Sequence, residues 1–378
     1  MTSHSTAEYA VIGLGAAGIA TLWNLARAGR DVIGIDKSDI PNDQGSSHGA
    51  TRLLRVAYSE GEKYVPLVRR AIGLWRELER EASARLFHQT GVFYAGSPGN
   101  KFIKASLASA QTHNVRLEHN AKGLSNQLTL PGDWSSFTEL EGGFVECEMA
   151  IQCLSDQARR AGARMMTRTH VKAISERNDC VDVETDRGTI SARKLVIATG
   201  AWSPELLPAL APQLSTERRT LHWFADPAGR YSLSSGFKPF IIDAGDGKSF
   251  YGFPDIDGRG VKVAEHLSGA DVVNIAELDR TITAQDSQSI QHLARKYLPD
   301  LNGPTHSKVC AYPMTSDGHF IIDRLTGSKR IIVGVGLCGH GFKFAPALGE
   351  ALACLAQDQL PPINVEFLSL RRFDAKTS

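Results

Sequence analysis

The apolar positions at the start of the chain form two short runs on either side of a stretch with helical spacing. In "YAVIGLGAAGIATLWNLARAGRDVIGID", the first run, at residues 9–12, predicts a strand, and a glycine-rich turn follows it. The small and apolar residues after the turn predict a helix from about Ala17 to Ala28, capped by Gly29. The second run predicts a strand that ends at Asp36. The chain is therefore expected to open with a βαβ unit.

Later segments alternate between the helical and the strand period. Residues 62–81 and 148–161 carry apolar side chains on one face at helical spacing, so each predicts a helix. From about residue 216 to residue 266, "TLHWFAD", "PFIIDA", "SFYGFP" and "VKVAEH" alternate as in an antiparallel sheet with one covered face. Beyond residue 305 the pattern returns to strand, turn and helix. We therefore predict an α/β fold, α+β overall.

The alternation of patterns also predicts two interleaved domains, for which 378 residues are sufficient. A doubly wound cofactor domain is assigned residues 1–85, 145–215 and 305–378. A β-rich substrate domain is assigned residues 86–144 and 216–304.

Composition and charge exclude several classes of function. The 42 Lys and Arg residues nearly cancel the 41 Asp and Glu residues, so we expect neither nucleic acid nor an anionic membrane as a partner. The polar start "MTSHSTAE" and the lack of a long apolar run predict no signal region, no membrane span and a cytoplasmic location. Six scattered cysteines show no metal-like spacing, so we expect free thiols and no metal site.

The turn "GLGAAG" has the GxGxxG spacing of dinucleotide-binding proteins in its required context, between a strand and a helix. Gly13 would allow the tight turn, Gly15 the approach of a pyrophosphate, and Gly18 close packing of helix on strand. The helix N-terminus would add positive potential, and Asp36 would bind a ribose. A plain βαβ turn fits these features less well, but the motif alone does not separate FAD from NAD.

Two further segments favour a flavin site. "ATGAW", which contains Gly200, ends a strand as in flavoproteins of the glutathione-reductase type, although an ordinary turn would look similar. "GSSHGATRLLR" brings His48, Arg52 and Arg55 together after the second strand, where ligands bind in such sheets. The two arginines would share a face if the segment were helical, and they suit a carboxylate or an electron-rich ring better than most side chains. Solvated surface arginines are the alternative.

Five motifs together resemble the monomeric sarcosine oxidase / N-methyl-L-tryptophan oxidase family of flavoprotein amine oxidases. They occur in order as "GSSHGATRLLRVAYSEGEKYVPLVRRAIGLW", "SFYGFP", "VKVAEH", "KVCAYPMTSDGHFIID" and "GHGFKF". The resemblance covers about residues 9–357 and implies a Rossmann-like FAD-binding domain of glutathione-reductase type. One departure is Ala50, which stands where the family loop His-Gly-Asp-Thr-Arg has its Asp.

The resemblance also implies how FAD is held. Cys310 matches the cysteine that joins the flavin 8α-methyl group, and His48 and Arg52 match residues that assist this attachment. Without the resemblance, Cys310 would be interpreted as a buried structural cysteine. The distal turn would wrap the flavin ring, and its matching residues are Gly339, His340, Gly341, Phe342 and Lys343.

The substrate and oxygen residues are likewise implied by the family. Lys262 matches a lysine that promotes oxygen reduction, whereas Tyr251 and His266 match residues of the amine pocket. Strand geometry puts Lys262 and His266 on one face but about 13 Å apart, which suggests separate tasks. Arg55 and Lys343 match the pair that binds the substrate carboxylate. A charged solvent-facing edge strand is the alternative for the strand residues.

We therefore expect a monomeric, FAD-dependent oxidase of N-methyl amino acids, with N-methyl-L-tryptophan as the first candidate substrate and molecular oxygen as the acceptor. Sarcosine or a cyclic imino acid such as pipecolate is the alternative within this class. The alternatives from other classes are an NAD-dependent dehydrogenase, a flavin-dependent tRNA-modifying oxidase and a flavin-binding protein without turnover. The near-zero net charge argues against the tRNA-modifying enzyme.

Overall fold

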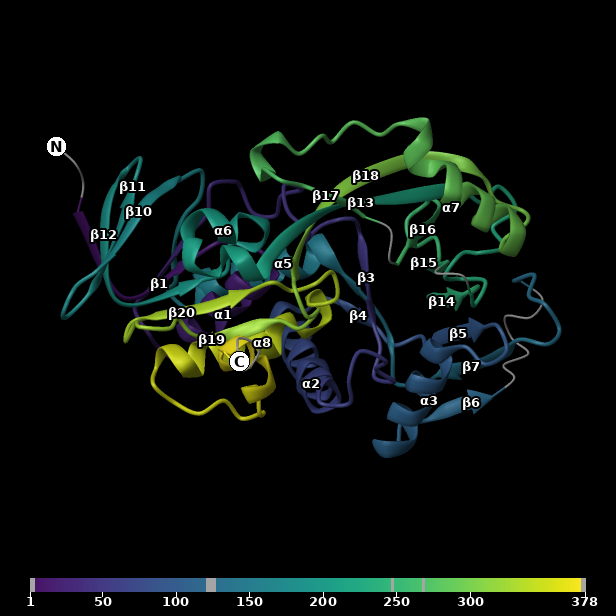
Figure 1. Cartoon of the computed structure of the whole chain (residues 1–378), viewed down its shortest axis with the longest axis horizontal. Coiled ribbons are helices and arrows are strands. Elements are labelled where there is room, and N and C mark those ends of the chain that lie inside the picture. Colours follow the sequence, from purple (N-terminus) through teal and green to yellow (C-terminus); the bar gives the residue numbers. More distant parts are fainter. Residues whose placement is uncertain (1–3, 120–126, 246–247, 267–268, 375–378) are drawn as a thin grey trace.

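The computed structural model of the chain describes residues 4–119, 127–245, 248–266 and 269–374. Residues 1–3 of the polar start and the tail at 375–378 lie outside this range. Within the described residues, three sheets are present, and helices lie beside both of the large ones (Figure 1).

The first sheet has eight strands among the described residues and contains the predicted βαβ unit. In its core, β2, β1, β12 and β20 run parallel in that order. β9 continues the parallel arrangement beside β2, whereas β10, β11 and β19 add antiparallel edges. The strands are β1 (His4–Ile12), β2 (Val32–Ile35), β9 (Arg164–Met166), β10 (Val171–Glu176), β11 (Val181–Thr185), β12 (Gly188–Ile197), β19 (Ile321–Arg324) and β20 (Ile331–Val335).

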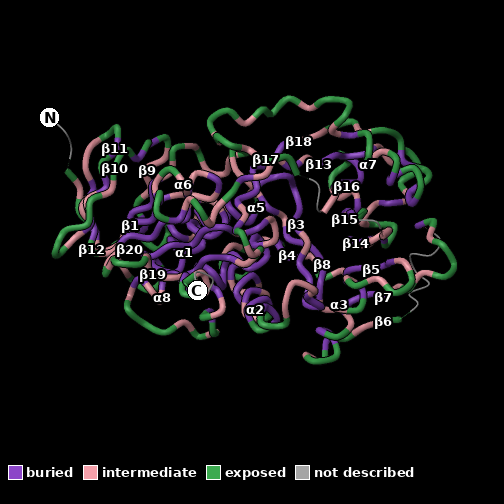
Figure 2. The backbone as a smooth tube through the Cα atoms, in the orientation of Figure 1, coloured by how far each residue is buried: buried purple, intermediate pink, exposed green. Residues whose placement is uncertain are grey.

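Three helices pack together beside this sheet. The central one, α1 (Ala16–Arg27), is buried over almost its whole length and contacts α5 (Cys147–Arg160) and α8 (Ala345–Ala356). A Cβ at Gly349 would lie 2.4 Å from the Ala20 carbonyl carbon, so glycine is what lets α8 approach α1. Figure 2 shows the buried backbone concentrated where these elements meet. The helices predicted at 17–28 and 148–161 are thereby confirmed.

The predicted helix at 62–81 is α2 (Tyr64–Ala82), which buries one face against α8 and α5. The other α-helices among the described residues are α3 (Lys101–Thr112), α6 (Ser203–Leu206), α7 (Ala284–Tyr297) and α9 (Arg371–Asp374). None of the helices in the described ranges combines the length and apolar character that a bilayer crossing requires.

The second sheet has nine strands among the described residues and is mainly antiparallel. It includes the four strands predicted between residues 216 and 266. Two long strands, β13 and β18, pair along their length and extend from the region of the first sheet toward α7 (Figure 1). The strands are β5 (Val92–Gly96), β6 (Leu117–His119), β7 (Ser135–Glu139), β13 (Leu214–Ala225), β14 (Phe240–Asp243), β15 (Ser249–Phe253), β16 (Val261–Glu265), β17 (Ala270–Asp271) and β18 (Asn302–Thr315).

A small third sheet consists of β3 (Thr51–Leu54), β8 (Gly143–Glu146) and β4 (Phe87–His88). β3 carries Arg52, and Arg55 follows it directly. The helical arrangement considered for these two arginines is therefore wrong, because the segment is extended and pairs with β8. The division into the two predicted domains stays a prediction, and β18 crosses the boundary expected at residues 304 and 305.

Candidate active site

The glycine turn after β1 forms one wall of a cavity of about 160 Å³. Gly13 has a φ of +84°, and a Cβ there would lie 2.6 Å from the Ala198 carbonyl oxygen. A Cβ at Gly18 would lie 1.8 Å from the Gly13 carbonyl oxygen, so both positions require glycine. Gly15 lines the cavity at the start of α1, whose first turn contains no acidic residue. The N-terminus of α1 therefore faces the cavity across a turn of glycines, and such a helix end suits an anion such as a pyrophosphate.

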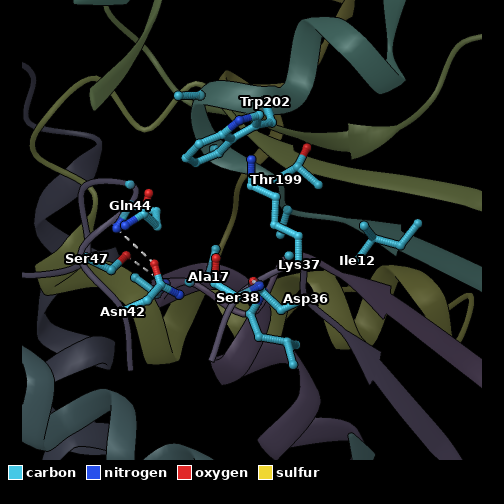
Figure 3. Close-up of a pocket in the computed structure, with 18 of the residues that line it drawn as sticks. Ile12, Ala17, Asp36, Lys37, Ser38, Asn42, Gln44, Ser47, Thr199 and Trp202 are labelled. Carbon is cyan, nitrogen blue, oxygen red and sulfur yellow. Dashed lines mark hydrogen bonds between the residues drawn. The ribbon is translucent and has the colours of Figure 1, made fainter. Parts of the chain in front are cut away.

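Other elements complete this cavity. Asp36 accepts hydrogen bonds from the Leu14 N–H at 2.7 Å and the Ser38 N–H at 2.8 Å, and burial raises its pKa. Gly200 lies in the short 3₁₀ turn that follows β12, with a φ of +57°. The Lys37 amino group lies 3.7 Å from the centre of the Trp202 ring (Figure 3). This contact was not predicted from the sequence. These features fit the dinucleotide part of FAD.

A buried polar cluster surrounds the thiol of Cys310 on β18. The His48 Nε2 lies 3.5 Å and the Arg52 Nη2 lies 3.7 Å from its Sγ. Burial raises the pKa of Cys310, although Arg52 and Lys262 lower it. Burial together with the Arg52 charge lowers the pKa of His48 to about 4, so its ring is neutral. Three sequence-predicted residues thus meet at one sulfur atom.

The loop that carries His48 and Arg52 is fixed by two charged residues from elsewhere in the chain. The Glu148 carboxylate accepts the N–H groups of Gly49 at 2.7 Å and Ala50 at 3.0 Å. The Lys262 amino group donates to the Gly49 carbonyl at 2.8 Å and to the Thr51 carbonyl. Lys262 is buried, and burial lowers its pKa well below the value of an exposed lysine. The role of Glu148 was not predicted, because its contacts are to backbone atoms about a hundred residues away.

A second cavity, of about 230 Å³, contains most of the residues expected to bind the substrate. Its polar lining includes Arg52, Arg55, Tyr251, His266, His340 and Lys343. Its apolar lining includes Leu53, Ile241, Met314 and Phe342. Lys262 does not line this cavity, so Lys262 and His266 occupy separate places, as their spacing on the strand predicted.

Arg55 and Lys343, the expected carboxylate-binding pair, are both buried at this second cavity. Lys343 donates to the His340 carbonyl at 2.6 Å and to the Tyr58 hydroxyl at 3.3 Å. Burial and the nearby Arg55 charge lower its pKa well below that of an exposed lysine. Arg55 pairs with Glu60, a residue that sequence reasoning missed. Burial opposes the ionisation of Glu60, but the Arg55 charge holds the pKa of this carboxyl well below its usual range.

The wall beside this pair comes from Tyr251 on β15 and from His266, which directly follows β16. The centres of their rings are 6.3 Å apart, and the planes of the rings are nearly perpendicular. Burial lowers the pKa of His266 to about 4, so its ring is neutral at neutral pH. An uncharged ring next to a bound amine avoids repulsion between two cations.

The distal turn between β20 and α8 encloses the other side of the cavity. Gly339 has a φ of +69°, and a Cβ there would lie 2.4 Å from the Tyr312 ring. The His340 Nδ1 lies 2.5 Å from the Tyr58 hydroxyl, and burial lowers the pKa of His340 to about 3. Phe342 stacks on Trp75 with ring centres 6.1 Å apart. The turn therefore presents a rigid, close-packed edge to the cavity.

The similarity to known proteins extends over nearly the whole chain. Residues 8–355 match the family described as FAD dependent oxidoreductase. The N-methyl-L-tryptophan oxidases of Yersinia pestis (strain Pestoides F) and Yersinia pseudotuberculosis serotype O:1b (strain IP 31758) are 36% identical over 369 residues, which cover 96% of this chain and 98% of theirs.

Solved structures share the fold at lower identity. NikD, an amino acid oxidase essential for nikkomycin biosynthesis, superposes with a TM-score of 0.85 at 23% identity over 97% of both chains. Glycine oxidase from Geobacillus kaustophilus superposes with a TM-score of 0.81 at 18% identity over 97% of this chain and 98% of that one.

Proposed function

The chain belongs to the FAD dependent oxidoreductase family, and from this premise we propose that it oxidises N-methyl amino acids, with N-methyl-L-tryptophan as the first candidate. The predicted fold class and enzyme class are confirmed by the family match and by the amino acid oxidases that share the fold. The choice of substrate is supported by the 36% identity to N-methyl-L-tryptophan oxidases.

The observation that carries the proposal is the pair of buried cations, Arg55 and Lys343, at one cavity with Tyr251 and His266. A substrate carboxylate between the two cations would form charge-assisted hydrogen bonds and fix the position of the amine. The carboxylate would have to displace Glu60, which holds Arg55 otherwise. The neutral His266 ring can then accept a hydrogen bond from the amine.

The net reaction balances with oxygen and water. N-methyl-L-tryptophan, O₂ and H₂O would give tryptophan, formaldehyde and hydrogen peroxide. When bound, FAD would supply the acceptor for the two electrons that leave the substrate. The chain would contribute the site for the substrate carboxylate, a water-poor cavity and fixed charges around the flavin ring.

We further propose that FAD is attached covalently through Cys310. The Arg52 guanidinium, 3.7 Å from Sγ, would stabilise the thiolate. The His48 Nε2 lies 3.5 Å from Sγ and 3.1 Å from the Gly45 carbonyl. If so, acid precipitation of the purified protein leaves the yellow colour in the pellet, whereas Cys310→Ser releases it to the supernatant. Colour in the wild-type supernatant would contradict covalent attachment while leaving the oxidase proposal intact.

Lys262 would promote the reaction with oxygen, because a buried cation stabilises negative charge that develops on O₂. Lys262→Met should slow reoxidation of the reduced flavin at least tenfold, with little change in anaerobic reduction by substrate. Since burial lowers the pKa of Lys262, its charge is lost at a lower pH than in an exposed lysine, so reoxidation should slow as the pH rises. Equal losses in both half-reactions would contradict an oxygen role.

An oxygen-consumption assay with N-methyl-L-tryptophan, sarcosine and pipecolate tests the reaction. Peroxide and formaldehyde should appear with N-methyl-L-tryptophan at the highest kcat/KM. No peroxide with any of the three would refute the oxidase, and a preference for pipecolate would favour the imino acid alternative. A monomeric state and a cytoplasmic location stay predictions, which sedimentation and cell fractionation can check.

A further inference from the structure

Arg219 is a third buried arginine at the second cavity, and neither the family motifs nor the proposed carboxylate site uses it. It lies on β13 directly opposite Cys310 of β18. Directly opposed residues of antiparallel strands project from the same face of a sheet, so Arg219 shares the face of Cys310. It lines the second cavity together with Arg55 and Lys343.

The guanidinium of Arg219 is held in a fixed orientation. Only 7% of the residue is exposed; its Nη1 donates to the His266 carbonyl at 3.4 Å, and its Nη2 pairs with Glu217. Its Nε has no acceptor among the residues that the structure describes. A Cβ at Gly269 would lie 2.6 Å from this Nε, so the glycine leaves this side of the group free of a side chain.

Part of the cavity wall that includes Arg219 is aromatic and apolar. Its guanidinium carbon lies 5.9 Å from the centre of the Tyr312 ring, and the same cavity is lined by Leu53, Ile241, Tyr251, Tyr312 and Met314. A planar guanidinium in such surroundings is attracted to the electron-rich face of an aromatic ring, and it gains nothing comparable from an aliphatic side chain. An acidic side chain would meet the Glu217 carboxylate as well as Arg219, so a neutral ring is the better partner.

We propose that Arg219 is a specificity-determining residue whose guanidinium stacks on the aromatic side chain of the substrate, while Arg55 and Lys343 hold its carboxylate. This inference rests on the proposed function and names the part of the site that would select an aromatic N-methyl amino acid.

The test compares substrates and variants in a matrix. N-methyl-L-tryptophan, N-methyl-L-leucine, N-methyl-L-glutamine and N-methyl-L-alanine are assayed with the wild-type holoenzyme, Arg219→Met and Arg219→Lys. Arg218→Met is the matched control, because Arg218 is the neighbouring residue on the other face of β13 and pairs with Asp286. Arg219→Met should lower kcat/KM for N-methyl-L-tryptophan about five- to thirtyfold. N-methyl-L-alanine should change less than threefold, and Arg219→Lys should retain part of the aromatic preference.

A series of ring-fluorinated N-methyl-L-tryptophans provides a readout that a structural role would not affect. Each fluorine weakens the negative face of the ring, so kcat/KM should fall stepwise in the wild type and in Arg218→Met. In Arg219→Met the series should be flat. A series with equal slopes in wild type and Arg219→Met, or an equal loss for every substrate, would overturn the inference.

The outcomes separate this inference from the proposed function. If N-methyl-L-alanine is oxidised but Arg219→Met leaves the aromatic preference unchanged, only the role of Arg219 is wrong. If N-methyl-L-glutamine is preferred over N-methyl-L-tryptophan, Arg219 acts as a hydrogen-bond donor and the aromatic role is contradicted. If no N-methyl amino acid reduces the flavin, the proposed function itself fails.

Discussion

Lys343 is a buried cation with no carboxylate within ion-pair distance among the described residues. Its amino group donates to the neutral oxygens of His340 and Tyr58. Burial and the Arg55 charge both disfavour its protonated form, which lowers its pKa. A substrate carboxylate would supply the missing counter-charge. A lysine held this way is a poor contributor to stability but a good receptor for a carboxylate.

Lys343→Met should therefore weaken the binding of carboxylate substrates by about 2 kcal/mol, or about thirtyfold in Kd. An uncharged amine should lose little, and anaerobic titration of the flavin spectrum measures both. Glu60→Gln should have the opposite effect on the carboxylate substrate, because it removes the group that competes for Arg55. If Lys343→Met weakens both ligands equally, the lysine is structural or acts on the flavin.

Ala50 has a φ of +64°, in the left-handed region that alanine adopts at a cost. Its N–H is held by Glu148, which keeps the residue in this conformation. Ala50→Gly should raise the free energy of unfolding by up to about 1 kcal/mol. Urea unfolding measures this change, and Gly29→Ala, at a φ of +72°, should shift stability in the opposite direction. A destabilising Ala50→Gly would show that the buried methyl group matters more than the backbone.

At the scale of elements, the segment after β3 depends on a carboxylate from β7. Glu139 is fully buried and accepts the N–H groups of Val56 at 2.5 Å and Ala57 at 3.1 Å, and the Tyr94 hydroxyl at 2.8 Å. Burial raises its pKa. Because Arg55 directly precedes these two N–H groups, Glu139 positions the guanidinium that would bind the substrate.

Glu139→Gln should cost about 1–3 kcal/mol of unfolding free energy, because the amide leaves at least one buried N–H without an acceptor. It should also raise KM for carboxylate substrates. Glu141→Gln is the matched control on the same segment, since Glu141 is partly exposed and pairs with the exposed Arg69; its effect should stay within about 0.5 kcal/mol. Equal effects in the two variants would argue against this role of Glu139.

The predictable elements are those whose residues carry local signals. The GxGxxG turn and the helix after it predicted the first βαβ unit, because Gly13 and Gly18 are required by contacts within that unit and with the adjoining strand. Glu60, Glu139 and Glu148 had no such signal. Glu139 and Glu148 accept backbone N–H groups that lie 82 to 99 residues away and that only the tertiary fold brings near. Glu60 pairs with Arg55 five residues before it, a spacing that an exposed ion pair would also show.

On the scale of the whole molecule, the paired strands β13 and β18 of the second sheet have one end near the first sheet (Figure 1). Arg219 lies on β13 and Cys310 lies opposite it on β18. The thiol that would attach the flavin therefore belongs to the same sheet as Tyr251, and His266 directly follows a strand of that sheet. The dinucleotide cavity lies at the first sheet, so cofactor binding would bridge both parts of the fold.

The neutral histidines of the two cavities predict how the flavin-free protein responds to acid. Burial lowers the pKa of His48 and His266 to about 4 and that of His340 to about 3. Between about pH 6.5 and pH 4 the unfolded chain binds protons that the folded chain does not, so stability is fully present above this range and falls as the pH drops through it. Each histidine contributes on the order of 3 kcal/mol to this loss.

Urea unfolding of the flavin-free protein across that pH range checks this response. His266→Asn should lose less stability on acidification than the wild type, because one of the titrating groups is gone. The same pH dependence in both proteins would contradict a His266 that is neutral in the folded protein.

The most direct test of the account is to mix the purified holoenzyme with N-methyl-L-tryptophan in the absence of oxygen and follow the flavin absorbance. We predict that the yellow absorbance is lost, that one equivalent each of tryptophan and formaldehyde forms per flavin, and that admission of oxygen restores the colour. A flavin spectrum that stays oxidised with N-methyl-L-tryptophan and with every other N-methyl amino acid would contradict it.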